Sequence, residues 1–194
     1  MERVAVYIDG TNFYGGISFI NPKYTDAKFD FERYINNILH KRKLICIKYY
    51  NASLKQQITP EIFKKQQKLF SRLRKIPLCE VILSKRKPRF DQEGNQYHTI
   101  KGDDIALAID MLSGAYENKY DTAILISSDG DFTPLLKKIK NIGKRSEVHY
   151  FSGCVSFDLL KEANKSTVIN KKILRKYFYM GPKIPAPNKQ SNSK

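Results

Sequence analysis

Residues 121–151 read DTAILISSDGDFTPLLKKIKNIGKRSEVHYF and contain a complete β–α–β unit. An apolar run predicts a buried strand at 121–127, and helical spacing predicts a helix at 131–142 that ends at Gly143, a favoured C-cap residue. A second strand is expected at 146–151. Because a helix that crosses between two strands makes them run parallel, the segment predicts an α/β fold.

The same alternation continues towards both ends of the chain. Residues 10–16, GTNFYGG, are rich in Gly and are expected to form a loop after the first strand. A mostly parallel central sheet with helices on both faces follows from this order. Further strands are expected at 3–8, 44–52 and 79–84, and further helices at 30–42, 60–76, 103–116 and 156–164.

The polar segment 85–102, KRKPRFDQEGNQYHTIKG, interrupts this alternation. Its EGN turn signal predicts a basic β-hairpin arm at about 85–100. Residues 181–194 are rich in Pro, Ser and Lys and are expected to be disordered. We therefore expect one domain over residues 1–170 that carries the arm, followed by a basic C-terminal tail over 171–194.

The chain is strongly basic, with 35 Lys and Arg against 19 Asp and Glu and a formal net charge of +16. Residues 63–89 alone hold ten basic residues and one acidic residue, Glu80. Such a cluster favours a polyanionic partner, most often a nucleic acid. Basic composition also arises in Lys-rich proteomes and on solvated helix faces, so charge alone does not decide the matter.

Several classes of protein are disfavoured by composition. No apolar run reaches the roughly 20 residues of a membrane span, and the N-terminus lacks the apolar core of a signal peptide. The three cysteines, Cys46, Cys79 and Cys154, are far apart and are interpreted as reduced thiols of a cytoplasmic protein. The Cys and His spacing fits no zinc site.

Acidic residues follow two of the predicted strands. Asp9 comes directly after the first strand, and Asp129 and Asp131 come directly after the strand at 121–127. Asp104 begins the helix after the arm. Because ligands of open parallel sheets bind beyond the carboxyl ends of the strands, these carboxylates are expected to share one cleft. In a basic protein, such a cluster predicts Mg²⁺ or Mn²⁺, which can bridge carboxylate and phosphate oxygens.

Each of these residues also has a purely structural interpretation. Asp131 could be only the N-cap of the next helix, or could serve as both cap and ligand. Asn12 could stabilise the turn after the first strand, and Lys101 could be a solvated lysine. Asp103 is interpreted as a cap, because Asp104 is the residue expected to share a face with Leu107, Ala108 and Met111. Asp110 lies on another face and is expected to be structural or to support the site.

Four motifs together resemble the NYN-domain family, in particular its LabA-like bacterial branch. They are VYIDGTNFY at 6–14, KGDDIALAIDM at 101–111, AILISSDGDFTPLLKKIKNIGKRSEVHYF at 123–151 and LLKEAN at 159–164. The resemblance implies a PIN-like nuclease fold, a three-layer α/β/α sandwich whose acidic cluster binds Mg²⁺ or Mn²⁺ and cuts RNA. Carried over to this chain, the metal-site positions are Asp9, Asp104, Asp129 and Asp131, with Asn12 and Lys101 nearby.

One departure from the branch is visible. The late helix of LabA-like proteins tends to carry an Ala-Asp pair where this chain has Ala163 and Asn164. If that aspartate supports the site in relatives, this chain lacks one carboxylate.

The resulting hypothesis is a metal-dependent endoribonuclease that acts on single-stranded RNA. Asp9, Asp104 and Asp129 would ligate the metal, and Asp131 would ligate it or orient the attacking water. Asn12 would position a ligand or phosphate oxygen, and Lys101 would contact the scissile phosphate. A basic surface would track the strand, formed by Lys64, Lys68, Arg72, Lys75, Lys85, Arg86, Lys87 and Arg89.

Three aromatic residues beside these basic residues, Tyr14, Phe90 and Tyr97, could stack on unpaired bases or could pack in the core or hairpin. Two other functions fit the same pattern. One is a non-catalytic RNA-binding regulatory protein on the same fold, and the other is a Mg²⁺-dependent phosphatase or nucleotide-sugar transferase. A homodimer is compatible with the sequence, which leaves the oligomeric state open.

Overall fold

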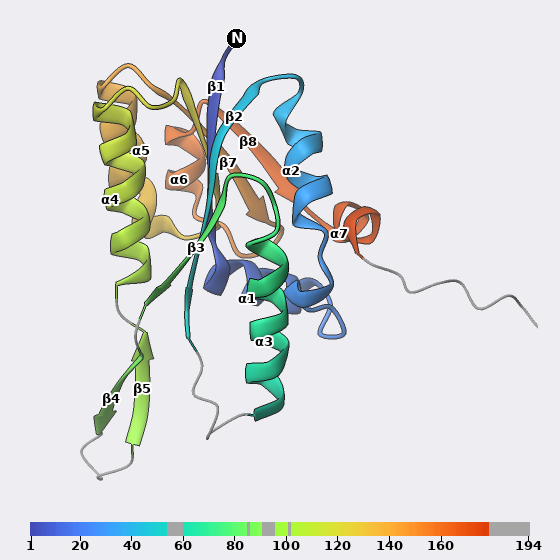
Figure 1. Ribbon diagram of the computed structural model, residues 1–194. Coiled ribbons are helices and arrows are strands. Elements are labelled where there is room, and N and C mark those ends of the chain that lie inside the picture. Colours follow the sequence, from blue (N-terminus) through green and yellow to red (C-terminus); the bar gives the residue numbers. More distant parts are fainter. Residues whose placement is uncertain (54–59, 85, 91–95, 101, 179–194) are drawn as a thin grey trace, which may run out of the picture.

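A single parallel sheet organises the molecule (Figure 1). The computed structural model describes residues 1–53, 60–84, 86–90, 96–100 and 102–178, with the backbone alone described for 86–90 and 96–100. Within these residues, six parallel strands pair in the order β3-β2-β1-β6-β7-β8. The strands are β1 (Arg3–Asp9), β2 (Lys43–Ala52), β3 (Cys79–Ser84), β6 (Thr122–Ile126), β7 (Arg145–Phe151) and β8 (Lys165–Ile169).

A separate antiparallel hairpin is formed by β4 (Arg86–Phe90) and β5 (Gln96–Ile100). It projects past the end of the sheet at which the parallel strands finish (Figure 1). The predicted arm is therefore confirmed as a hairpin.

Helices cover both faces of the sheet and make a three-layer α/β/α sandwich, as predicted. One layer holds α1 (Gly10–Ile20), α2 (Phe31–Leu39), α3 (Pro60–Leu73) and α7 (Lys171–Tyr177), with the short 3₁₀ helix η1 (Asp26–Lys28). The other layer holds α4 (Asp103–Tyr116), α5 (Thr133–Asn141) and α6 (Phe157–Glu162), with η2 (Gly130–Phe132) before α5.

The alternation of side chains along β1 divides the core into two halves. Val4, Val6 and Ile8 are fully buried against the layer that contains α1 and α2. Ala5 and Tyr7 point the other way, into the core beneath α4 and α5. Because successive side chains of a strand face opposite sides, a strand buried on both faces must be apolar at nearly every position. This requirement explains the uninterrupted apolar run of β1.

The predicted loop at residues 10–16 is wrong, because these residues begin helix α1. The carboxylate of Asp9 accepts a hydrogen bond from the N–H of Asn12 at 2.9 Å and caps the helix. Gly16 lies so close to β7 that a Cβ would be 2.2–2.8 Å from ring atoms of Phe151. Glycine therefore serves close packing of helix on sheet here, a tertiary requirement that overrides its low helix propensity.

The sequence also missed the last strand and the last helix. Strand β8 completes the sheet, and α7 packs where the tail was expected to begin. Leu174 and Tyr177 are buried, and the carbonyl of Tyr177 accepts a 2.7 Å hydrogen bond from the N–H of Asp30. The packed chain therefore extends to at least residue 178, past the boundary expected at 170.

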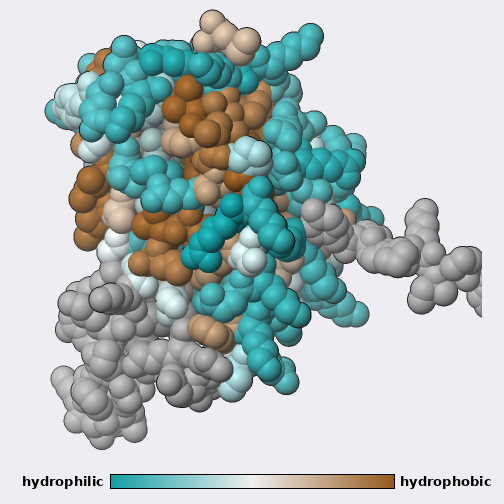
Figure 2. All heavy atoms as spheres, viewed as in Figure 1, coloured by the Kyte–Doolittle hydropathy of each residue, from teal (hydrophilic) through white to brown (hydrophobic). Residues whose placement is uncertain are grey.

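The surface of the molecule differs between the two sides of β3. Figure 2 shows hydrophilic side chains over α3. It shows apolar side chains in the region between α4 and strands β2 and β3. Within the described ranges, the helices are too short or too polar to span a bilayer.

We predict that Gly16→Ala destabilises the protein by about 1–3 kcal/mol, because the added methyl group would overlap the Phe151 ring. Gly15, its neighbour in α1, provides a matched control, since a methyl group added there would meet no atom within 4 Å. Gly15→Ala should stabilise by up to about 1 kcal/mol through helix propensity. Urea unfolding of both variants checks the pair, and equal effects at the two positions would contradict it.

Candidate active site

The carboxyl ends of two neighbouring strands meet at an acidic cavity. Strands β1 and β6 are hydrogen-bonded neighbours, and Asp9 and Asp129 follow from their carboxyl ends. The cavity has a volume of about 170 Å³. Its lining residues are Asp9, Thr11, Asn12, Asp103, Asp104 and Asp129. Three of the four predicted metal-site aspartates are therefore brought together, along with Asn12.

Asp9 is the most buried of these residues, with 4% of its surface exposed. One carboxylate oxygen caps α1, and the other accepts a 3.1 Å hydrogen bond from the hydroxyl of Ser127. Burial, together with the negative charges of Asp104 and Asp103, raises the pKa of Asp9 to about 7, although both hydrogen bonds act in the opposite direction. Asp9 is thus a fixed carboxylate in an environment that disfavours its charge.

A serine pair ties the two strand ends together. Ser127 donates to Asp9, and its oxygen accepts a 3.1 Å hydrogen bond from the N–H of Asp129. The side-chain oxygen of Asn12 accepts from the N–H of Ser128 at 2.9 Å. The side chain of Asn12 therefore links α1 to the loop after β6 rather than stabilising the turn after β1, and Asn12 also lines the cavity.

Helix α4 begins at Asp103, as the predicted range 103–116 has it, but the aspartate that it turns inward is Asp103 and not Asp104. Asp103 is 6% exposed and accepts a 3.3 Å hydrogen bond from Thr11, whereas Asp104 is exposed at the cavity rim. The interpretation of Asp103 as a cap is wrong, because Gly102, with φ of +102°, occupies the N-cap position. The signal was present in the sequence: Asp103, Leu107 and Met111 recur every four residues, which marks the buried face.

Asp131 lies outside the cavity. Its backbone N–H donates to the carboxylate of Asp129 at 2.9 Å, so Asp129 caps η2. The prediction that Asp131 caps the next helix is wrong, because α5 begins at Thr133 without a side-chain cap. The Asp131 carboxylate is exposed, yet it is close enough to help raise the pKa of Asp104, after burial and the charges of Asp103 and Asp129.

The composition of the cavity fits a hard divalent cation. Of the described residues that line it, four are aspartates and none is basic. The donor atoms that these aspartates offer are all oxygens, which Mg²⁺ and Mn²⁺ prefer. Across the described ranges, no three His, Cys, Asp or Glu side chains stand close enough to form a finished metal site. The donors therefore match such an ion, and binding would require the carboxylates to close around it.

Asn164 lies at the end of the sheet where the strands begin, opposite to the end that bears the cavity. Its side-chain oxygen accepts a 2.8 Å hydrogen bond from the N–H of Ser146, and its own N–H donates to the carbonyl of Ser146 at 2.9 Å. Ser146 is at the beginning of β7, whereas the acidic cavity is beyond the strand ends. Asn164 is therefore not a missing carboxylate of the cavity. Asp110 is likewise structural, since it bonds to Lys48 at 2.8 Å and Tyr50 at 2.7 Å.

The predicted basic surface divides along α3. Lys64 is exposed on the first half of the helix and Lys68 just past its middle, and the helix begins near the end of the sheet that bears the cavity (Figure 1). Lys75 lies beyond the other end of α3. Arg72 donates to the carbonyls of Ala27 and Phe29, the latter at 3.0 Å, and holds η1 against α3. Arg72 is thus engaged within the protein, and contact of Arg72 and Lys75 with RNA stays a prediction.

For the arm, the structure describes the backbone of the two strands of the hairpin. Lys85 and Lys101 fall outside the described residues, as do the side chains of Arg86, Lys87, Arg89, Phe90 and Tyr97. Tyr14 is on α1 with 49% of its surface exposed, which rules out the core-packing interpretation for this residue.

Comparison with known proteins agrees with this geometry. The family model of the NYN domain matches residues 3–170. A crystal structure of a protein of unknown function from Vibrio parahaemolyticus RIMD 2210633 superposes with a TM-score of 0.68 at 23% sequence identity, covering 89% of this chain and 96% of that chain. At this identity the likeness supports the fold alone. No curated protein sequence matches the chain.

The pKa of Asp9 predicts a pH-dependent stability. A carboxyl whose pKa is about 7 when folded and about 3.9 when unfolded binds its proton more tightly in the folded state, so stability falls as pH rises between these values. In EDTA, the free energy of unfolding should decrease by up to about 4 kcal/mol from pH 4 to pH 7. Asp9→Asn should remove most of this decrease. Urea unfolding at several pH values in this range measures the effect. An equal pH dependence of the free energy of unfolding in the wild type and in Asp9→Asn would contradict the assignment.

Proposed function

The chain belongs to the NYN-domain family of PIN-like nucleases, and we propose that it is a metal-dependent ribonuclease that hydrolyses phosphodiester bonds of single-stranded RNA. The proposed reaction takes place at the acidic cavity beyond β1 and β6. Endonucleolytic cleavage is the mode we propose, at a cavity beyond the carboxyl ends of the two central strands of the sheet.

One observation carries the proposal. Four aspartates from three separate parts of the chain line one small cavity in a protein with a net charge of +16. Burying carboxylates together is unfavourable unless a cation compensates their charge. The rest of the surface supplies basic residues that can hold a polyanion. The aspartates would then bind the cation while the basic residues bind the phosphates.

Asp9, Asp104 and Asp129 are the proposed ligands of Mg²⁺ or Mn²⁺, with Asp103 beside them. When bound, such an ion polarises the scissile phosphate and lowers the pKa of a coordinated water, which supplies the nucleophile. Asp9 is held by its two hydrogen bonds, so its position is set before any ligand binds. Asp129 is similarly fixed, because it caps η2.

The neighbouring polar residues would orient the substrate. The amide nitrogen of Asn12 can donate to a phosphate oxygen, since its oxygen is already engaged with Ser128. Asp131, which is exposed outside the cavity, would accept a proton from the attacking water or orient it. Lys101, next to the start of α4 in sequence, is the proposed contact to the scissile phosphate.

The RNA strand would be held by basic residues on α3 and on the arm. Lys64 and Lys68 are exposed on α3, and Arg86, Lys87 and Arg89 belong to β4. Exposed Tyr14 offers a surface on which an unpaired base can stack. Stacking of this kind favours single strands over duplexes, in which base faces are covered.

We predict that Asp129→Asn lowers the rate of Mn²⁺- or Mg²⁺-dependent cleavage of a fluorescent single-stranded RNA by about 100-fold or more, because a proposed metal ligand is lost. Asp110→Asn is the matched control on α4, since Asp110 bonds to Lys48 and Tyr50 away from the cavity. Its cleavage rate should stay within about threefold of the wild type, and EDTA should abolish all cleavage.

Other outcomes would point to other functions. Salt-sensitive RNA binding without cleavage in either metal would overturn the nuclease and favour a non-catalytic RNA-binding regulatory protein. Hydrolysis of small phosphate esters without RNA binding would favour a phosphatase or transferase on this fold.

We also predict that Lys64→Ala with Lys68→Ala reduces the salt dependence of RNA binding. For single strands, each lost phosphate contact lowers the slope of log affinity against log salt by about 0.7, so the double variant should lose about 1.4. Lys41→Ala with Lys43→Ala is the control, because both lysines are exposed at the start of β2, at the end of the sheet opposite to the cavity. Fluorescence anisotropy at several salt concentrations measures the slopes, and equal slopes for the two double variants would contradict the placement.

A further inference from the structure

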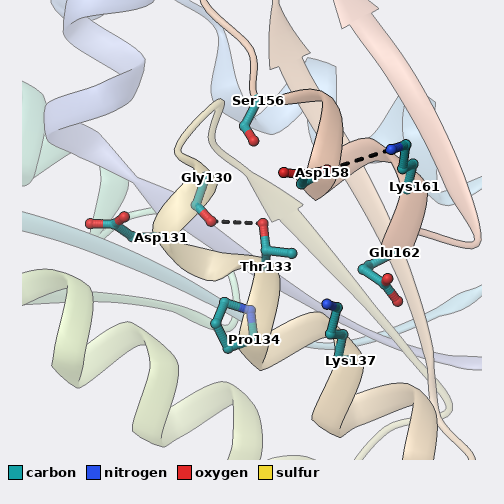
Figure 3. A pocket seen from close by; sticks show the side chains of 9 residues that line it. All are labelled: Gly130, Asp131, Thr133, Pro134, Lys137, Ser156, Asp158, Lys161 and Glu162. Carbon is teal, nitrogen blue, oxygen red and sulfur yellow. Dashed lines mark hydrogen bonds and ion pairs between the residues drawn. The ribbon is translucent and has the colours of Figure 1, made fainter.

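A second, larger hollow adjoins the acidic cavity. It has a volume of about 520 Å³ and lies between η2 with the start of α5 on one side and α6 on the other (Figure 3). We call it the α5–α6 groove, and the residues that matter here are Gly130, Asp131, Lys137, Ser156, Asp158 and Lys161. Asp129 lines the cavity while Gly130 and Asp131 line the groove, so η2 forms the wall between them.

The position of the groove relative to the cavity is fixed by a close contact. A Cβ at Gly130 would lie 2.9 Å from both the Cβ and Oγ of Ser156, so only glycine allows η2 and the start of α6 to approach this closely. The N–H of Ser156 donates to the carbonyl of Ser128 at 3.3 Å. The loop that carries Asp129 and the far wall of the groove are therefore attached to each other.

Within the part of the chain that the structure describes, one ammonium group and one hydroxyl of the groove have no partner. Asp158 pairs with Lys161 at 3.6 Å, and Glu162 pairs with Lys140 at 3.9 Å. Lys137 has no ion pair or hydrogen bond among the described residues, and its ammonium points into the groove (Figure 3). The hydroxyl of Ser156 forms no hydrogen bond in that part of the chain either. Asp131 points away from this space (Figure 3).

This set of groups suits one ribonucleotide. A free ammonium binds a phosphate, while a hydroxyl and a carboxylate side by side can bind a sugar hydroxyl, which both donates and accepts. The volume is within the range of about 300–1,000 Å³ that small-molecule pockets span. For an RNA strand whose scissile phosphate lies at Asp129, the groove is the hollow on the other side of η2 in which an adjacent nucleotide can lie.

We propose that the α5–α6 groove binds the ribonucleotide next to the scissile phosphate, with Lys137 at its phosphate and Ser156 and Asp158 at its ribose 2′-hydroxyl. The inference rests on the proposed ribonuclease function. It goes further by assigning the preference for RNA over DNA to named residues, because the 2′-hydroxyl is the group that distinguishes the two.

The phosphate contact is tested by binding, measured separately from cleavage. Lys137→Ala should weaken the binding of a fluorescent single-stranded RNA, measured by anisotropy, by about tenfold, and Lys137→Arg should restore most of it. Lys138→Ala is the matched control, because Lys138 is the next residue of α5, is exposed and does not line the groove. Equal losses for Lys137→Ala and Lys138→Ala would overturn the proposal.

The sugar contact has its own readout. The ratio of RNA affinity to affinity for DNA of the same sequence should fall about fivefold or more in Ser156→Ala and in Asp158→Asn. An unchanged ratio in both variants would overturn the assignment of the ribose contact. Cleavage decides the other question: loss of groove binding in a protein that cuts no RNA would sink the nuclease alone, and cleavage with no effect of the groove variants would sink the groove alone.

Discussion

A carboxylate that is 4% exposed and has three further aspartates around the same cavity is unfavourable in its ionised form, and the candidate site is built around this constraint. Asp9 is held where it is by an N–H from α1 and by the hydroxyl of Ser127. The same serine fixes Asp129, and Asn12 fixes the loop beside it. The polar contacts at this edge of the sheet thus position negative charges that only a cation can neutralise together.

The sheet order explains how a basic protein keeps such a cavity acidic. Strands β1 and β6 lie in the middle of the sheet, so the cavity is central, whereas β3 is an outer strand that follows α3 and precedes the hairpin. Direct ion pairs between basic residues and the aspartates would have neutralised the cavity. None of the described residues that line the cavity is basic, whereas the lysines of α3 are exposed, so a long anion could contact α3 while a cation occupies the cavity.

Much of this arrangement could be predicted from the sequence, because it follows from topology. Parallel strands carry their following residues to one edge, which brought Asp9 and Asp129 together without any side-chain information. The features that were missed depend on contacts between distant residues. Gly16 allows α1 to pack closely on Phe151, and half-buried Arg72 donates to the carbonyls of Ala27 and Phe29.

The remaining differences come from local details that periodicity does not resolve. The left-handed backbone of Gly102 sets the start of α4, and this choice turns Asp103 rather than Asp104 towards the interior. Helix α7 was missed because its stabilising partner, the segment around Asp30, is far away in the sequence. The question raised by Asn164 disappears once the strand directions are known, since that residue lies where the strands begin.

The double duty of Asp9 has a consequence for how such sites change over evolutionary time. Its side chain caps a helix as well as facing the cavity, so a descendant that no longer cuts anything would still require a capping side chain, Asp or Asn, at this position. Asp104 is exposed and forms no hydrogen bond through its side chain in the described part of the chain, so it is free to drift once chemistry is lost. Among relatives of this protein, the fate of the exposed aspartate is therefore a better record of activity than that of the buried one.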